Sequence, residues 1–244
     1  MSQGLRTVGL SKSYGHVAAL RGVSLAVSPG ELVVVLGPSG SGKSTLFRCI
    51  TRLTEPDRGE VYVGDRAIHG LKGPALAEAR REIGVVFQQF NLVRRRTALE
   101  NVLAGRLGAA PLWRVAAGRF SRSDMARAAE ALRSVGLERQ AHQRADTLSG
   151  GQQQRVAIAR ALAQQSRVLL ADEPVASLDP DSAVAVLELM RGLTRSAGLA
   201  VLCTLHQPHL AERFADRVLR MEEGRLAGDV ARRPVTNQAA HGIL

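Results

Sequence analysis

A glycine-rich string with a lysine and a serine at its end is the first feature of the chain that could do chemistry. Residues 37–44 read Gly-Pro-Ser-Gly-Ser-Gly-Lys-Ser. The β-branched apolar run at 31–36 predicts a buried strand before it, and apolar residues at 46, 47, 50 and 53 predict a helix after it. Glycines let backbone N–H groups turn toward phosphate oxygens, and a helix N-terminus adds a favourable dipole. The spacing predicts a nucleoside triphosphate site, with Lys43 at the β- and γ-phosphates and Ser44 on Mg²⁺.

Two adjacent carboxylates, Asp172 and Glu173, follow a second apolar run at 167–171. Acids at the tip of a buried strand are costly unless a cation or a reacting group balances them. We expect Asp172 to hold Mg²⁺, directly or through a water, and Glu173 to polarise a water that attacks the γ-phosphate. Alone, the pair would fit a solvated loop equally well. Together with the phosphate loop (residues 37–44) it indicates hydrolysis.

A second glycine-rich string, Leu-Ser-Gly-Gly-Gln at 148–152, opens a predicted helix at 152–163. Ser149 is placed to cap that helix, and the amides of Gly150 and Gly151 are free donors, so the string predicts an anion site. A capped helix with nothing bound is the simpler alternative. The two interpretations are compatible if the loop is empty in a single chain and contacts the nucleotide of a second copy in a dimer.

In their order along the chain, these strings resemble the ATP-binding subunits of ABC transporters, over essentially the whole length. The resemblance implies an α/β fold: a P-loop NTPase (ABC ATPase) core with an antiparallel β lobe and an inserted helical lobe at about 91–148. It implies one ABC ATP-binding domain spanning 1–244, and a homodimer that closes head to tail around two ATP molecules. ATP and Mg²⁺ are the implied cofactors, and ATP hydrolysis coupled to transport is the implied activity.

The family pattern also assigns roles to single residues. Tyr14 matches an aromatic that stacks on adenine, although a lone tyrosine is also an ordinary surface residue. Gln88 matches the glutamine that senses Mg²⁺ and the lytic water, and only the family register selects it over Gln89. Asp179 matches the D-loop and His206 a switch histidine, which at a strand end is otherwise usually structural. The implied catalytic residues are Lys43, Gln88, Glu173 and His206. Those implied for Mg²⁺ are Ser44, Gln88 and Asp172. Those implied for ATP are Tyr14, Gly37, Pro38, Ser39, Gly40, Ser41, Gly42, Lys43, Ser44, Thr45, Ser149, Gly150, Gly151, Gln152 and Asp179.

Turn residues and periodicity predict the elements that position these side chains. Short strands in 1–36 and 59–70 predict an antiparallel lobe, and Gly136 predicts a helix end. The other predicted elements are a strand at 83–87, helices at 98–107 and 124–135, a strand at 168–171, a helix at 180–198, a strand at 199–205, a helix at 208–214 and a hairpin around 222–224.

Several strings resemble phosphonate-import ATP-binding subunits in particular: 87–93, 99–103, 111–114, 141–144 and 205–207. The first, second and last also occur in importers of methionine or polar amino acids, whereas Pro-Leu-Trp-Arg at 111–114 and Ala-His-Gln-Arg at 141–144 are narrower. Trp113 is the only tryptophan, and we expect it to pack inside the helical lobe rather than to shape a partner surface. The resemblance implies import of phosphonate or a related phosphorus oxyanion. The alternatives are an amino-acid or methionine importer and a non-transport ABC ATPase acting on nucleic acid.

The composition is compatible with this interpretation. The net charge is +11, but aromatic residues make up only 3% and the arginines are scattered, which argues against a single-strand-binding platform. We therefore expect no nucleic acid, and a peripheral protein on the cytoplasmic face of the (inner) cell membrane. Its partners would be integral-membrane permease subunits and, indirectly, a periplasmic or extracellular substrate-binding protein. Arg94-Arg95-Arg96 departs from the family pattern and fits a solvated loop or a contact with an acidic or lipid-facing surface.

The two cysteines, Cys49 and Cys203, lie within apolar segments and lack metal-ligand spacing. They are therefore expected to be reduced core residues in a reducing compartment. No signal peptide is evident, and no apolar run approaches the roughly 18 residues that span a bilayer.

Overall fold

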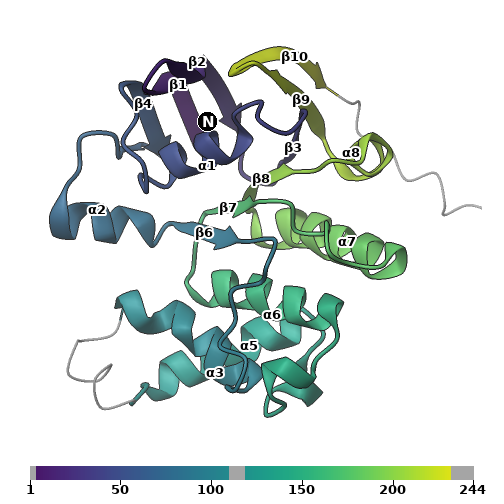
Figure 1. Cartoon of the computed structure of the whole chain (residues 1–244). Coiled ribbons are helices and arrows are strands. Elements are labelled where there is room, and N and C mark those ends of the chain that lie inside the picture. The colour runs from purple at the N-terminus through teal and green to yellow at the C-terminus, as the bar shows by residue number, and fades with distance from the viewer. Residues whose placement is uncertain (1–3, 110–118, 232–244) are drawn as a thin grey trace, which may run out of the picture.

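The computed structural model describes residues 4–109 and 119–231 and contains two β-sheets (Figure 1). The smaller sheet has the order β2(Val17–Val27), β1(Leu5–Tyr14), β4(Arg58–Val63) and β5(Arg66–Ala67), with every pairing antiparallel. This sheet matches the antiparallel lobe predicted over 1–36 and 59–70, except that residues 32–36 belong to the larger sheet.

The larger sheet is parallel except at one edge. Its order is β10(Arg225–Ala231), β9(Arg217–Glu222), β3(Leu32–Leu36), β8(Ala200–Thr204), β7(Val168–Ala171) and β6(Ile83–Val86), with only β10 antiparallel to its neighbour. All residues of β3, β7 and β8 are buried. Strands covered on both faces are continuous apolar runs in sequence, which is why these three were recognisable.

Packing on the two faces of this sheet divides the core in two. Val33 and Val35 point toward α1(Lys43–Ile50) and the antiparallel sheet. Val34 and Leu36 belong to the other cluster, which joins α7(Pro180–Ala197), α8(Pro208–Phe214) and the helical lobe. A further short helix, α2(Gly73–Arg80), precedes β6.

The helical lobe consists of α3(Ala98–Leu103), α5(Arg122–Ser134) and α6(Gly150–Ala163), at the bottom of Figure 1. Three short 3₁₀ segments accompany them, η1(Ala104–Ala109), η2(Glu138–Gln140) and η3(Ala145–Thr147). α3 and α5 both begin with a capping box, built on Thr97 and Ser121, which satisfies first-turn N–H groups. Within the described ranges, no helix is long and apolar enough to cross a membrane.

Several element boundaries differ from the prediction, three of them as follows. The helix after the phosphate loop ends at Ile50, so Leu53 lies beyond it and is 65% exposed. The predicted helix at 98–107 is an α-helix to Leu103 and then a 3₁₀ segment, because Ala104–Ala109 contains two glycines, which weaken an α-helix. The helix predicted from Gln152 begins at Gly150, directly after its cap. The string at 111–114, including Trp113, lies outside the described residues.

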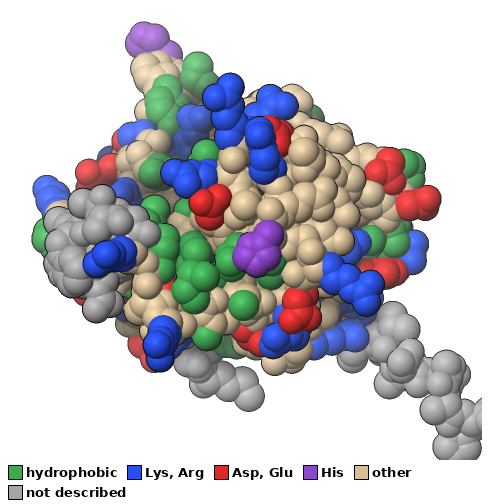
Figure 2. All heavy atoms as spheres, turned by 90° about the horizontal axis from the view of Figure 1, so that it is seen from below, with side chains coloured by type: hydrophobic (Ala, Val, Ile, Leu, Met, Phe, Trp, Pro, Cys, Tyr) green, Lys and Arg blue, Asp and Glu red, His purple; other side chains and the backbone are tan. Residues whose placement is uncertain are grey.

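Basic and acidic side chains are interspersed on the lower face of the molecule (Figure 2). Arg96 pairs with Glu100 and Arg144 with Asp146 in this lobe. The positive charge of the chain is therefore not gathered into one basic patch on this face.

Candidate nucleotide site

Four of the predicted site segments follow the carboxyl ends of parallel strands. β3 leads into the phosphate loop, β7 into Asp172 and Glu173, β8 into the segment with His206, and β6 into Gln88. These strands are parallel, so their carboxyl ends meet at one edge of the sheet, the usual ligand site of open α/β sheets.

The phosphate loop is closely packed, and two of its glycines have no room for a side chain. A Cβ at Gly37 would lie 2.3 Å from the Met221 carbonyl oxygen, and one at Gly42 would lie 2.4 Å from that of Ala19. Gly42 also has a φ of 107°, a left-handed conformation that favours glycine. The loop therefore needs glycine at both positions.

Lys43 is buried and holds its ammonium group over the loop. Its Nζ donates to the carbonyl oxygens of Gly37 at 2.7 Å and Pro38 at 3.0 Å. The Oγ of Ser41 is buried nearby without a hydrogen-bond partner among the described residues. A buried polar atom without a partner is uncommon, and here it fits a phosphate oxygen as the missing acceptor.

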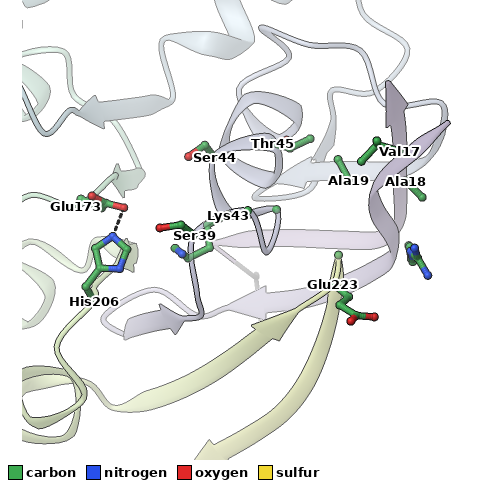
Figure 3. A pocket seen from close by; sticks show the side chains of 14 residues that line it. Val17, Ala18, Ala19, Ser39, Lys43, Ser44, Thr45, Glu173, His206 and Glu223 are labelled. Carbon is green, nitrogen blue, oxygen red and sulfur yellow. Dashed lines mark hydrogen bonds and ion pairs between the residues drawn. The ribbon is translucent and has the colours of Figure 1, made fainter. Parts of the chain in front are cut away.

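A cavity of about 610 Å³ lies over this loop (Figure 3). One wall is the phosphate loop and the start of α1. A second wall is the start of β2 and the turn between β9 and β10. Glu173 and His206 face the loop from the remaining side. The lining residues include eight of the predicted ones: Ser39, Gly40, Gly42, Lys43, Ser44, Thr45, Glu173 and His206. This volume is within the range of small-molecule sites.

Hydrogen bonds fix the two carboxylates that follow β7, Asp172 and Glu173. Glu173 Oε1 lies 2.5 Å from His206 Nε2. Glu173 has a φ of 49°, which is rare for a residue other than glycine, and its backbone N–H donates to Thr204 Oγ1 at 2.8 Å. The same hydroxyl donates to Asp172 Oδ1 at 2.9 Å. Thr204 is not among the predicted residues, since its only signal in the sequence is a hydroxyl at the end of an apolar strand.

Tyr14 and Gln88 are among the predicted residues that do not line the cavity. Tyr14 is 47% exposed at the end of β1, and Val17 of the next strand lines the cavity instead. Gln88 is exposed after β6 and does not line the cavity. The segment that contains it, 87–91, includes Phe90 and Asn91, whose φ values of 58° and 49° are left-handed.

The signature loop (residues 148–152) does not reach the cavity of its own chain. Ser149 and Gln152 form a capping box at the start of α6, in the helical lobe. A Cβ on Gly151 would lie 2.9 Å from Ser182 Oγ, so this loop packs against the beginning of α7. Asp179 caps α7 by accepting from the Ser182 N–H at 2.9 Å, which holds the pKa of its carboxyl below the ordinary value.

The oxygen donors of the site suit Mg²⁺. Ser44 and Asp172 offer a hydroxyl and a carboxylate, the hard oxygen ligands that this ion prefers. No group of three or more His, Cys, Asp or Glu that could hold a metal occurs within residues 4–109 and 119–231. Mg²⁺ commonly binds through one or two protein oxygens together with phosphates and waters, and the residues here fit that mode.

Comparison with known proteins identifies the class. The sequence model of the ABC transporter family matches residues 20–176, and this chain belongs to that family. The hypophosphite import ATP-binding protein HtxD of Stutzerimonas stutzeri is 46% identical over 98% of this chain and 70% of its own length. A phosphonates import ATP-binding protein, PhnC 2 of Halalkalibacterium halodurans, is 45% identical over 96% of each chain.

Solved structures agree with the fold. The ATP-binding cassette MJ0796, in a dimeric post-hydrolysis state bound to ADP and Pi, is 37% identical with a TM-score of 0.80, over 94% of this chain and 99% of that one. The ATP-binding cassette MJ1267 in its ADP conformation has a TM-score of 0.83 at 29% identity, over 95% of this chain and 92% of that one. The predicted α/β ABC ATPase fold and the family resemblance are confirmed.

Proposed function

We propose that this chain is the ATP-hydrolysing subunit of an importer for phosphonate or a closely related phosphorus oxyanion. ATP hydrolysis coupled to transport is the activity of its family, and relatives named for phosphonate and hypophosphite import are 45–46% identical over nearly all of this chain. In this proposal the whole chain is one ATP-binding domain.

The proposal that this chain hydrolyses ATP rests on the arrangement of side chains around one cavity. Lys43, Ser44, Glu173 and His206 line it together, although they come from three separate segments of the chain. A cation and a hydroxyl on one side and a carboxylate with an imidazole on the other are the groups that phosphoryl transfer to water requires.

The signature loop supports a dimer as the working unit. It offers helix-terminal N–H groups, yet it lies in the other lobe and does not line the cavity of its own chain. In the proposed head-to-tail dimer, Ser149 and Gly151 of one copy contact the γ-phosphate held by the phosphate loop of the other. Closure excludes water and completes the ring of donors around that phosphate.

We propose roles for single residues that are supported by the family pattern and, for Lys43, Glu173 and His206, also by their place in the cavity. Lys43 neutralises charge on the β- and γ-phosphates, and Glu173 accepts a proton from the attacking water while His206 fixes the carboxylate. Ser44 and Asp172 would hold Mg²⁺, with Gln88 joining them on closure, and the ion would neutralise phosphate charge. Tyr14 would stack on adenine and Asp179 would face the partner copy.

Transport requires partners. We propose that permease subunits in the membrane bind near Gln88 and the helical lobe on the cytoplasmic side. A substrate-binding protein outside would select the cargo, since the cargo never contacts this chain.

The test is co-purification followed by uptake. Glu173→Gln protein with ATP and Mg²⁺ should capture permease subunits from detergent-solubilised native membranes, identified by mass spectrometry. Vesicles containing the wild-type complex and its binding protein should then take up methylphosphonate in preference to methionine. Capture of ribosomal or DNA-repair proteins without a permease would contradict transport, and preferential uptake of methionine would contradict the cargo.

A further inference from the structure

Thr204 connects the two acidic residues of the site through a single hydroxyl. Its side chain is fully buried at the end of β8. The Oγ1 atom donates to Asp172 Oδ1 at 2.9 Å and accepts from the Glu173 N–H at 2.8 Å. We propose that Thr204 is a positioning residue for ATP hydrolysis, which orients Asp172 toward the cation and Glu173 toward the attacking water.

The register of the sheet places this threonine beside the acids. β7 and β8 are parallel, with Ala171 opposite Cys203, so the next residue of β8 lies level with the first residue after β7. The Thr204 hydroxyl therefore links the ends of two neighbouring strands. The end of β7 leads into Asp172 and Glu173, and the end of β8 leads into His206, two residues after Thr204.

The bond to the Glu173 N–H holds an unusual backbone conformation. Glu173 has a φ of 49°, and a residue other than glycine keeps a left-handed conformation only where its surroundings hold it. This conformation directs the carboxylate to His206, 2.5 Å away, and into the cavity. Without the acceptor at Thr204, the N–H would be left unpaired.

The bond to Asp172 leaves one carboxylate oxygen available. Oδ1 accepts the threonine proton, and Oδ2 has no hydrogen-bond partner within the described ranges. Groups that hydrogen-bond to a metal ligand fix its orientation, and their loss commonly lowers metal affinity or activity about 10- to 100-fold. A hydroxyl can donate and accept with one atom, and an aliphatic side chain of the same shape can do neither.

This inference rests on the roles proposed above for Asp172 and Glu173. The decisive variant is Thr204→Val, which keeps the shape and removes the hydroxyl. Thr204→Ser restores the hydroxyl. Thr194→Val is the matched control, because Thr194 is also fully buried and its hydroxyl donates to a carbonyl oxygen, that of Arg191 at 2.7 Å, away from the site.

The measurements are the single-turnover rate of ATP hydrolysis, the binding of Mn²⁺ to the ATP-loaded protein followed by electron paramagnetic resonance, and ATP affinity without a metal. Thr204→Val should lower the rate and the Mn²⁺ affinity about 10- to 100-fold with little change in metal-free ATP affinity. Thr204→Ser should recover most of both losses. Thr194→Val should lower the melting temperature and leave the hydrolysis rate, the Mn²⁺ affinity and the ATP affinity unchanged.

Wild-type rate and Mn²⁺ affinity in Thr204→Val would overturn the proposal, and so would a Thr204→Ser variant as impaired as Thr204→Val. If Thr204→Val fails to fold, Thr204→Ser still decides, with the wild-type protein as the reference. A Thr204→Ser variant that folds but loses both the hydrolysis rate and the Mn²⁺ affinity contradicts a role for the hydroxyl. Normal turnover in Glu173→Gln would instead show that the proposed hydrolytic site is wrong. The two failures are therefore distinguishable.

Discussion

Arg160 on α6 donates through Nη1 to the backbone carbonyl oxygen of Asn91 at 2.6 Å, across 69 positions of sequence. Its Nη2 donates to the carbonyl oxygen of Phe90 at 3.0 Å. Both acceptor residues have left-handed φ values, which for residues other than glycine cost roughly 1 kcal/mol each. Burial lowers the pKa of the Arg160 guanidinium. The helix that begins with the signature loop thus holds the segment that contains Gln88.

Removing this guanidinium should loosen the segment. A hydrogen bond from a charged group contributes about 1.5–3 kcal/mol, so Arg160→Met should speed amide exchange at residues 89–92 by roughly tenfold or more. Hydrogen–deuterium exchange of the purified chain measures this. Arg191→Met is the control, because Arg191 also donates to a distant carbonyl oxygen, that of Arg213. Equal exchange at 89–92 in wild type and Arg160→Met would show that other contacts hold the segment.

Lys43→Ala should lose nucleotide affinity. The Lys43 ammonium lies over the phosphate loop, and charged hydrogen bonds contribute about 1.5–3 kcal/mol, so ATP affinity should fall roughly 10- to 100-fold by calorimetry. Lys72→Ala removes an exposed lysine at the start of α2 and should bind ATP like wild type. Unchanged affinity in Lys43→Ala would contradict the assignment of this loop.

Asp124 should make the helical lobe sensitive to acid. Its carboxylate accepts from Ser121 and from Arg106, and these bonds hold its pKa below the ordinary value. Its contribution to stability is therefore fully present above the unfolded-state pKa, about 4, and is lost as the pH falls through the lower folded-state pKa.

Asp124→Asn tests this contribution by urea unfolding. Removing one partner of a buried ion pair costs about 3–5 kcal/mol, and we expect a loss near the lower end at pH 7 because the amide oxygen still accepts from Ser121. The difference from wild type should shrink as the pH is lowered toward 3. Glu188→Gln breaks an exposed pair with Arg213 and should cost under about 1 kcal/mol. If the loss of unfolding free energy in Asp124→Asn stays constant with pH, the charge of the Asp124 carboxylate is not its cause.

The two cysteines should be unreactive in the folded protein. Burial raises the pKa of Cys49 to about 11, and burial together with the charge of Asp172 raises that of Cys203. Because the thiolate is the reactive form, neither thiol should react with Ellman's reagent at neutral pH until guanidinium chloride unfolds the chain. Rapid reaction of one thiol under native conditions would mean that its surroundings open.

Much of the fold was predictable because local rules determine it. Strands β3, β7 and β8 were recognisable as short apolar runs, and α7 by its proline at the start and Gly198, with a φ of 63°, at its end. Caps such as Ser149 follow from side-chain chemistry within one helical turn. The short 3₁₀ segment after α3 was not predictable, since the α-helical and 3₁₀ patterns differ little over six residues.

Contacts between distant segments could not be predicted. The phosphate loop was recognisable because its chemistry lies in one contiguous string, but nothing local to Thr204 or Arg160 shows that each binds a segment 31 or 69 positions away. Those bonds depend on strand order and helix packing. The roles of Tyr14 and Gln88 depend on ligand and partner surfaces, so they stay predictions.

The most direct test of the central claim, a nucleotide site completed by a second copy, is sedimentation of Glu173→Gln with and without ATP and Mg²⁺. We predict an ATP-dependent dimer. Adding Ser149→Arg should abolish the dimer while leaving ATP binding by the monomer intact, because the signature loop lies outside the cavity of its own chain. A Glu173→Gln protein that binds ATP and stays monomeric, or a double variant that dimerises as readily, would contradict the shared site.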